Sequence, residues 1–445
     1  MKKNMSSESG QAIIMIVISI VVLLGFTALA IDGGMVLSDR RHAQNSADSA
    51  ALAGALQKVN GASDAEIGQA ALFSALANGF DAAIVDVIIT PVTDFSGSYH
   101  LVTVTITSTT QTSFVQMFWG ESGMRNRVTA TARVRLTQPA LPGTAIVGMG
   151  DCTSNVDHVI AIAGGGNSGD VRTFDGGVFL NSPEAGNAHC AIDPPPSGVI
   201  AIESGYSIYT VGNQDYTSNA SNLNFDNVSP RPALTGINGG STIDDPLTEL
   251  PDPVCAQDGS IAANGHYQPG NYDRAAYTSA PEIGPGIWDK GLYCVSGNIS
   301  LSGQEKIDAT SGVTLYMIDG GIYTTGQAGI QIIAPDNVNP DGSVCDPENK
   351  DPSDSCTFQA VAIFMARRNP QPIDLQGNGT IRITGLVYAL NTTMTAGGGG
   401  SSADEYTVLG QIIAKAIYSN GNGSFNVVYN AGRTYWKPPL ISLER

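Results

Sequence analysis

One loop of the sequence carries oxygen-bearing residues at the spacing that calcium binding requires. Counted from Asn337, such residues occupy positions 1, 3 and 5, and glycine and glutamate follow at positions 6 and 12. Calcium takes about six to eight oxygen ligands and needs a sharp glycine turn, so this loop predicts a calcium site. Asparagine at position 1, proline at position 4 and the lack of expected flanking helices leave a solvated acidic loop as the alternative. The candidate ligands are Asn337, Asn339, Asp341, Ser343 and Glu348.

The cysteines indicate disulfides. All six lie at or beyond Cys152, far from one another, and no C-x-x-C is present. This spacing is not typical of zinc or redox sites, so we expect disulfides formed in an oxidising compartment. Cys345 and Cys356 bracket a short polar loop and are the simplest pair to propose. The other four candidates, whose pairing stays open, are Cys152, Cys190, Cys255 and Cys294.

The remaining reactive residues form no recognisable catalytic motif. There is no H-E-x-x-H, no G-x-S-x-G and no phosphate-binding loop. Arg367-Arg368 is expected to be a solvated corner. We therefore expect no enzyme activity and no cofactor beyond the possible calcium; an enzyme acting on polysaccharide is the alternative. Four aspartates could serve such an enzyme, but their spacing does not place them on one face: Asp175, Asp193, Asp319 and Asp374. The five histidines are scattered at His42, His100, His158, His189 and His266.

The composition divides the chain of 445 residues into two parts. The formal net charge is −18, and residues 139–445 supply −17 of it, with 13 Lys/Arg against 30 Asp/Glu. The same part holds 22 of the 23 prolines. A strongly acidic chain excludes a nucleic-acid partner, because phosphates need a basic face. We read residues 139–150 as a linker and residues 151–445 as an acidic, glycine-rich head.

Residues 12–31 form an uncharged apolar run long enough to cross a membrane as a helix. Its few hydroxyls, on Ser19 and Thr27, can bond to the helix's own carbonyls. Lys2 and Lys3 favour a cytoplasmic N-terminus, whereas Arg40-Arg41 on the far side weaken that orientation. We expect residues 1–31 to be a cytoplasmic tip and a retained single-pass anchor. Cleavage after Ala30, in an A-x-A setting, is the alternative.

The helix-forming sequence continues beyond the apolar run with small residues on one face. Ala43, Ala47, Ala50, Ala51 and Gly54 follow three- and four-residue steps. Such a stripe permits close packing of a second element. Packing within the same domain and packing in a filament or membrane assembly are both open.

Several short strings occur here in a fixed order. They are Gly10-Gln11-Ala12, Ala30-Ile31-Asp32-Gly33-Gly34, Arg40-Arg41, and the stretch from Gln44 to Ala55. In this order they resemble the N-terminal region of TadE/TadG-like proteins of the Tad (Flp) pilus system, over about 55 residues. The resemblance implies an inner-membrane-anchored protein whose bulk faces outward. It also implies pilus-assembly or surface proteins as partners.

Residues 32–138 predict a helical stem and a small pilin-like α+β domain. A helix is expected over Asp64–Ala77, capped by Asp64. Alternation of apolar and polar residues predicts strands. They are expected at Ile84–Thr90, Leu101–Thr107 and Arg127–Leu136, with a short amphipathic turn or helix at Thr112–Trp119. Asp94–Ser98 matches a D-x-S-x-S metal motif, but its turn-forming residues favour a hairpin.

Residues 139–445 predict short strands separated by Gly and Asn corners. Phe179 and Tyr209, Tyr293 and Tyr323, and Tyr388 and Tyr418 are each 30 positions apart. A recurrence on this scale favours a parallel β-helix, or solenoid, with a β-sandwich or jelly roll as the alternative. The whole chain is therefore expected to be mainly β.

These observations lead to one functional expectation and two alternatives. We expect a membrane-anchored, extracytoplasmic structural, assembly or adhesion protein at the cell surface. The first alternative is a membrane-tethered enzyme that acts on polysaccharide. The second is that residues 1–57 are only an export module, unrelated to pili. The oligomeric state is not predicted.

Overall fold

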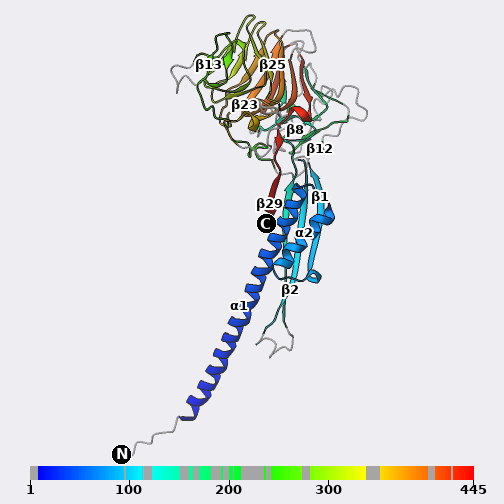
Figure 1. Cartoon of the computed structure of the whole chain (residues 1–445), viewed down its shortest axis with the longest axis vertical. Coiled ribbons are helices and arrows are strands. Elements are labelled where there is room, and N and C mark those ends of the chain that lie inside the picture. The colour runs from blue at the N-terminus through cyan, green and yellow to red at the C-terminus, as the bar shows by residue number, and fades with distance from the viewer. Residues whose placement is uncertain are drawn as a thin grey trace, which may run out of the picture. The chain divides into compact units, whose positions relative to one another are not determined.

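The computed structural model divides the chain into two compact units (Figure 1). Unit 1 contains Met1–Gln138 and Pro438–Arg445, and unit 2 contains Pro139–Lys437. The structure describes residues 9–94, 97–112, 114, 123–150, 160–163, 170–181, 192–193, 200–203, 205–211, 235–236, 242–272, 281–336, 351–398, 406–421 and 424–444.

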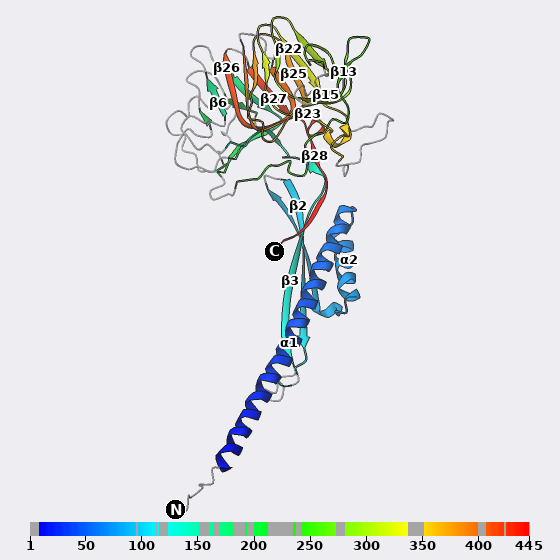
Figure 2. The ribbon, with the colours of Figure 1, turned by 90° about the vertical axis from the view of Figure 1, so that its left-hand side faces the viewer.

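Unit 1 places two helices on one face of an antiparallel sheet. The helices are α1 (Ser9–Val59) and α2 (Asp64–Ala77). The sheet has the order β1-β2-β3-β29, with a short 3-10 turn, η1, before β1. Figure 2 shows the N-terminal half of α1 extending away from the sheet. The bounds are η1 (Ala82–Ile84), β1 (Val85–Asp94), β2 (Gly97–Thr110), β3 (Met124–Arg135) and β29 (Leu440–Glu444).

Alternating side chains explain this sheet. Along β2, Val102, Val104 and Ile106 are fully buried beneath the helices. The intervening threonines face the other side, where Thr103 and Thr105 meet threonine hydroxyls of β3 at 3.1 Å. Alternation therefore predicted the buried faces of β2 and β3. Leu136 is the exception, since it lies beyond β3 and is 37% exposed.

The expected helix Asp64–Ala77 is confirmed, but its cap is Ser63 and not Asp64. The Ser63 hydroxyl accepts the Glu66 amide, and the Glu66 carboxylate accepts the Ser63 amide at 2.8 Å. This reciprocal arrangement is a capping box, in which the cap residue precedes the first helical residue. Asp64 occupies the first turn, where its charge suits the helix dipole.

The small-residue stripe of α1 packs inside unit 1. Its four alanines are fully buried. A Cβ atom on Gly54 would lie 3.0 Å from Val102 of β2 and 3.3 Å from Ala71 and Ile67 of α2. At Gly54, therefore, α1 packs closely against both α2 and the sheet.

The β1–β2 hairpin encloses the D-x-S-x-S string. The strands are antiparallel, and Asp94 pairs with Gly97. The hairpin expected from the turn-forming residues is confirmed by this pairing. Most of the expected turn or helix at Thr112–Trp119 lies outside the described residues.

Unit 2 is built from short strands joined mainly in parallel, and 21 of them form one sheet. The expected mainly β content is confirmed, and the parallel pairing does not fit a jelly roll, which is antiparallel. The strands are β5 (Thr144–Gly148), β6 (Ile160–Ala163), β7 (Asp170–Phe174), β8 (Gly177–Leu180), β9 (Ile192–Asp193), β10 (Ile200–Ile202), β11 (Ile208–Thr210), β12 (Thr235–Gly236), β13 (Ser260–Ile261), β14 (Tyr267–Gln268), β15 (Gly270–Tyr272), β16 (Gly286–Ile287), β17 (Gly291–Val295), β18 (Ile299–Leu301), β19 (Lys306–Ala309), β20 (Val313–Met317), β21 (Ile322–Thr324), β22 (Gly329–Ile333), β23 (Val361–Met365), β24 (Ile373–Gln376), β25 (Ile381–Gly398), β26 (Tyr406–Gly421) and β27 (Ser424–Tyr429).

The strands pair in parallel rows. One row runs β15-β17-β20-β23-β25-β26-β5-β8-β11-β12. A second runs β18-β21-β24-β25-β26-β6-β9, and a third runs β16-β19-β22-β25-β26-β27-β7-β10. The long strands β25 and β26 contribute to all three rows.

Spatial order in these rows differs from chain order. The chain enters at β5 in the middle of the first row and runs outward to β12. It resumes at the opposite end of that row with β15 and returns strand by strand to β26. Strand β26 pairs with β25 and also with β5 and β6, so it joins the two halves.

The register of the strands places apolar side chains in line with one another in the core. Aligned positions of the first row form an apolar column that is at most 1% exposed. Neighbouring strands lie about 4.8 Å apart, so such columns pack continuously. The column is Tyr293, Leu315, Ile363, Val387, Ile412, Ile146 and Val178.

The repeat length expected from the aromatic residues is correct at one place only. Phe179 pairs with Tyr209, as the 30-residue spacing predicted. Tyr293 pairs instead with Leu315, and Tyr388 with Ile413. The spacing there is shorter because the corners contain fewer residues.

The expected head region also ends differently. The strand β29 pairs with β3, from Leu440 beside Arg135 to Glu444 beside Thr131. Pro438–Arg445 thus folds with unit 1, and unit 2 is an insertion between two neighbouring strands of unit 1. Sequence composition had placed these residues in the head because local patterns carry no information on so distant a partner.

Replacing Gly54 by leucine should destabilise unit 1. The new side chain would overlap Val102 and Ala71, and overpacking of this kind costs about 1–3 kcal/mol. Helical circular dichroism at 222 nm, followed during thermal unfolding in detergent, measures the effect. Gly68→Leu in α2 is the matched control, because nothing lies within 4 Å of its Cβ position. Equal stability of the two variants would contradict the packing assigned to Gly54.

Candidate functional site

The first candidate site is the apolar half of α1. The large apolar side chains from Ile13 to Ile31 are 46–71% exposed. The Ser19 and Thr27 hydroxyls donate to the carbonyls of Met15 and Leu23 at 2.7 and 2.8 Å, as the sequence predicted. By length and composition this helix can cross a membrane. An apolar surface of this size needs a cover, and a bilayer is a suitable one.

A polar clamp at Asp39 attaches the following part of α1 to the sheet. One carboxylate oxygen, Oδ2, accepts three hydrogen bonds. The donors are the Ser108 hydroxyl at 2.6 Å, the Thr110 hydroxyl at 2.8 Å and the Asn126 amide at 2.8 Å. Burial alone would raise the pKa of Asp39, but these hydrogen bonds and nearby His42 outweigh it and lower the pKa overall. The clamp is therefore strongest with Asp39 ionised.

Two further contacts extend this attachment along α1. Closer to the apolar run, the buried Asp32 carboxylate accepts the Phe114 amide at 3.0 Å. At the other end, the His42 ring lies 5.1 Å from the Phe80 ring and 3.0 Å from the Asn78 carbonyl oxygen. Helix α1 and the rest of unit 1 are thus held together at several points along the helix.

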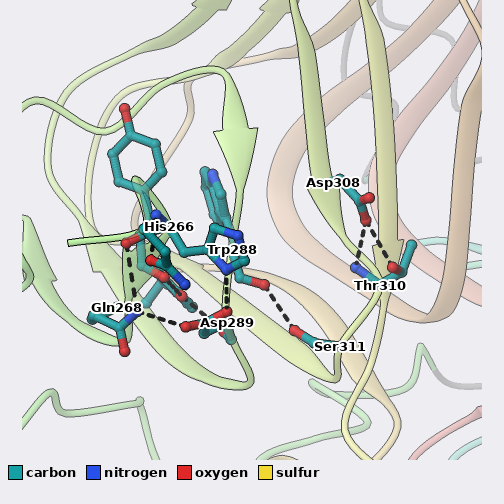
Figure 3. Close-up of polar contacts among 10 residues, drawn as sticks. His266, Gln268, Trp288, Asp289, Asp308, Thr310 and Ser311 are labelled. Atoms are coloured by element: carbon teal, nitrogen blue, oxygen red, sulfur yellow. Dashed lines mark hydrogen bonds and ion pairs between the residues drawn. The ribbon is translucent and has the colours of Figure 1, made fainter. Parts of the chain in front are cut away.

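A second candidate site in unit 2 joins His266, Gln268 and Asp289 (Figure 3). His266 Nδ1 lies 2.9 Å from Asp289 Oδ1, and the Gln268 amide donates to Asp289 Oδ2 at 2.6 Å. The hydrogen bonds from Gln268 and His266 lower the pKa of Asp289. Figure 3 shows Asp308 and Thr310 as a separate pair, away from this group. These contacts attach β14 to the turn after β16.

Aromatic rings support this corner of unit 2. Trp288 is fully buried, and its ring lies 4.9 Å from that of Tyr293. The ring of Tyr272 also stacks on the ring of Tyr293, with 5.9 Å between the ring centres. Burial raises the pKa of Tyr272 to about 12, so its hydroxyl stays protonated and donates to the carbonyls of Ser260 and Gln268.

A half-buried arginine forms the third polar cluster. Arg367 donates to the Asp245 and Asp252 carboxylates and, at 2.7 Å, to the carbonyls of Leu247 and Leu250. Burial opposes its charge, but the hydrogen bond to Asp245 and the nearby acidic groups raise the pKa of Arg367.

Arg367 is therefore not the solvated corner that the sequence suggested. Its guanidinium lies 5.4 Å from the Phe364 ring and 5.5 Å from the Tyr388 ring. The Tyr388 hydroxyl donates to Asp245 at 2.8 Å. The cluster fastens residues 245–252 over the outer side of β23 and β25. No local pattern marks Arg367, since its partners lie more than a hundred positions away.

The cysteine prediction is tested at one pair. Cys255 and Cys294 form a disulfide with a Cα–Cα distance of 5.9 Å. Closing a loop of this length contributes about 4 kcal/mol in the chain-entropy account. Cys356 is also disulfide-bonded, while Cys152, Cys190 and Cys345 lie outside the described residues.

The calcium prediction cannot be compared with any contact, because all its ligands lie outside the described residues. These are Asn337, Asn339, Asp341, Ser343 and Glu348. Among the residues that are described, no group of three or more His, Cys, Asp or Glu could hold a metal ion. Calcium binding at the loop stays a prediction.

The candidate acidic residues make contacts with other parts of unit 2. Asp319 accepts from Ser296 and the Gly297 amide, and Asp374 accepts from Gln376. The Asp175 amide donates to Glu203. The side chain of Asp193 lies outside the described part.

A pocket of about 480 Å³ beside Cys255 is lined by two carboxylates. Asp351 accepts from Ser353, and Asp354 caps a short 3-10 turn, η2 (Ser355–Phe358). Both carboxylates thus have structural partners. The cluster of three acidic or basic groups that a polysaccharide-acting groove requires does not line this pocket in the described part of the chain.

Removing the charge of Asp39 should make the unfolding free energy of unit 1 less dependent on pH in the acidic range. A lowered folded-state pKa contributes stability above the unfolded value of about 3.9, and this stability is lost as the pH falls through the folded value. Wild type should therefore lose unfolding free energy as the pH falls below about 5, and Asp39→Asn should lose less. Helical circular dichroism measures both. Asp86→Asn, on exposed β1, is the control, and an Asp39→Asn profile parallel to wild type would refute the clamp.

Truncating Arg367 should destabilise unit 2. Arg367→Ala removes the guanidinium from the Asp245 carboxylate, which keeps the Tyr388 hydroxyl as a donor, and from two carbonyls, at a cost of roughly 2–4 kcal/mol. Arg367→Lys should recover only part of this, because lysine cannot reach all four acceptors. Denaturation followed by the fluorescence of buried Trp288 measures the change. Arg368→Ala, at the adjacent exposed position, is the control and should unfold like wild type. Equal denaturation midpoints for Arg367→Ala and Arg368→Ala would contradict the stabilising role assigned to Arg367.

Comparison with known proteins identifies one part of the chain. No curated protein and no solved structure matches it significantly. The matched part covers most of α1, including Asp32 and Asp39. Residues 10–57 match the family described as putative Flp pilus-assembly TadE/G-like, so the N-terminal region of this protein is similar to that family.

Proposed function

We propose that this protein is a membrane-anchored, extracytoplasmic structural or adhesion component associated with a Tad-type pilus-assembly system. One observation carries the proposal: α1 is a continuous helix whose exposed apolar half leads directly into a half clamped to a folded unit. Such a helix holds the folded unit at a membrane surface. The TadE/G-like match of residues 10–57 supplies the pilus context.

Two features support an outward position of the folded bulk. Lys2 and Lys3 precede the apolar run, which favours a cytoplasmic N-terminus. The Cys255–Cys294 disulfide in unit 2 suits an oxidising compartment. We therefore propose a single-pass protein with residues 32–445 outside the cytoplasm.

We further propose that unit 2 is a parallel β-solenoid. Three parallel rows share β25 and β26, and from β5 to β11 and from β16 to β25 each strand is followed along the chain by a strand of the next row. A chain that visits three faces in a constant order winds into coils. The acidic outer surface of these coils is then the surface offered to pilus-assembly or surface proteins.

Fractionation combined with protease protection tests the anchor and its orientation. We expect the full-length chain in the membrane fraction, resistant to carbonate extraction, with protease added from outside removing everything beyond about the apolar run. A soluble protein beginning at Ile31 would overturn the anchored reading. Protection of unit 2 from external protease would overturn the orientation.

The pilus association needs a separate test. Loss or alteration of pili on gene deletion, together with binding of unit 2 to pilus subunits, is the expected result. Normal pili would leave residues 1–57 as an export module only. Release of a cleaved product from an acidic polysaccharide would replace the structural role with an enzymatic one.

A further inference from the structure

The end of the β2–β3 hairpin lies beside the point where the apolar run of α1 stops. Ile31 is the last residue of the run, and Asp32 is the next position, a rise of about 1.5 Å along the helix. The Phe114 amide lies 3.0 Å from the Asp32 carboxylate. Phe114 therefore lies at the level where the hydrocarbon core would end.

The hairpin reaches this level because it runs alongside α1. The Gln44 amide of α1 contacts the Thr129 carbonyl, Asp39 contacts the residues around Asn126, and Asp32 contacts Phe114. Residues of α1 that lie closer to the apolar run thus contact residues that lie closer to the end of the hairpin. Figures 1 and 2 both show the lower ends of β2 and β3 directed along α1.

The described residues at this end are suited to a lipid interface. Phe114 is 37% exposed and Met124, which opens β3, is 47% exposed. Leu37 of α1 is 58% exposed on the same stretch of helix. Arg125 is exposed next to Met124 and can meet an anionic headgroup.

We propose that Phe114 and the start of β3, at Met124 and Arg125, form a second membrane contact, seated in the interfacial layer beside the anchor helix. The occupant of this surface is the lipid bilayer that α1 crosses. The interfacial layer is about 5–7 Å deep on each side of the core, which matches the level of Phe114 beside Asp32. The inference rests on the proposed anchoring of α1. The Asp32 and Asp39 contacts are the positioning elements, because they hold the hairpin parallel to the helix.

Two contacts with the bilayer have a mechanical consequence. A single helix can tilt and rotate in a membrane, and its tilt is set by neighbouring contacts and interfacial residues. A hairpin fixed to the helix and seated in the interface restricts both motions. Unit 1 then has a defined orientation to the membrane surface.

Depth-dependent quenching in vesicles tests this contact on the full chain. A fluorescent dye is attached at Phe114→Cys, or at Met124→Cys if the first variant does not fold. The protein is reconstituted into phosphatidylcholine and phosphatidylglycerol vesicles carrying a nitroxide at either the headgroup or the middle of the acyl chain. Labelling is done without reductant, with wild type measuring background from the native cysteines.

Two further positions are matched controls. Leu23→Cys lies in the apolar run and reports the anchor, and Phe73→Cys lies on α2, where the side chain is 73% exposed, and reports solvent. We expect the dye at 114 or 124 to be quenched by the headgroup nitroxide at least about twofold more than the dye at 73. The dye at 23 should respond chiefly to the acyl-chain nitroxide.

The outcomes separate the two proposals. If the dye at 114 or 124 behaves like that at 73 while position 23 is quenched from within the acyl region, the hairpin contact is wrong and the anchor stands. Stronger quenching of the hairpin dye by the acyl-chain nitroxide would also reject an interfacial seat. If position 23 is not quenched, the anchor itself is wrong. Adding Asp39→Ala should reduce headgroup quenching at 114, since the hairpin is then released from α1.

Discussion

Strand β26 is the element on which unit 2 depends. It pairs with β25 along most of its length and, on its other side, with β27, β5 and β6. Because β5 and β6 come from the beginning of unit 2 and β25 from near its end, β26 joins the two halves of the large sheet. Without β26, the backbone amides and carbonyls of β25 on one side and of β5 and β6 on the other would lose their partners. Unpaired backbone groups are unfavourable in a buried sheet.

Elsewhere, segments that are distant in sequence are attached by single half-buried charged side chains. Asp39 gathers three donors from β2 and β3, and Arg367 gathers two carboxylates and two carbonyls from residues 245–252. Each cluster is satisfied on several sides, so burial of its charge is compensated. In both cases the polar contacts fix how the two segments align with each other. Apolar contacts between flat surfaces do not specify this alignment.

Local patterns predicted the parts of the fold that depend on neighbouring residues. Alternation in Leu101–Thr107 located β2, the small-residue steps located the buried face of α1, and the apolar run located the exposed helix. The cap of α2 was misplaced by one position because Ser63 and Asp64 both suit a helix start. Failures were larger where partners are distant: Arg367 was assigned to solvent, and Leu440–Glu444 was assigned to the head.

The candidate sites were predictable to a smaller extent. Cysteine usage predicted disulfides but left the pairing open, since spacing does not determine which coils meet. Asp39 lies between the apolar run and Arg40-Arg41, and only its helical position beside a small-residue face could have suggested a partner. The His266–Asp289 pair depends on stacking of β14 against the residues after β16, which no spacing in the sequence reveals.

The insertion of unit 2 between β3 and β29 sets an order of events during synthesis. Translation makes β3 first, then all of Pro139–Lys437, and only then β29. The sheet that packs against α1 therefore waits, with one edge of β3 unpaired, until the inserted unit has been made. Completion of unit 1 becomes a late event that follows the synthesis of unit 2, even though its helices are the first parts of the chain to emerge.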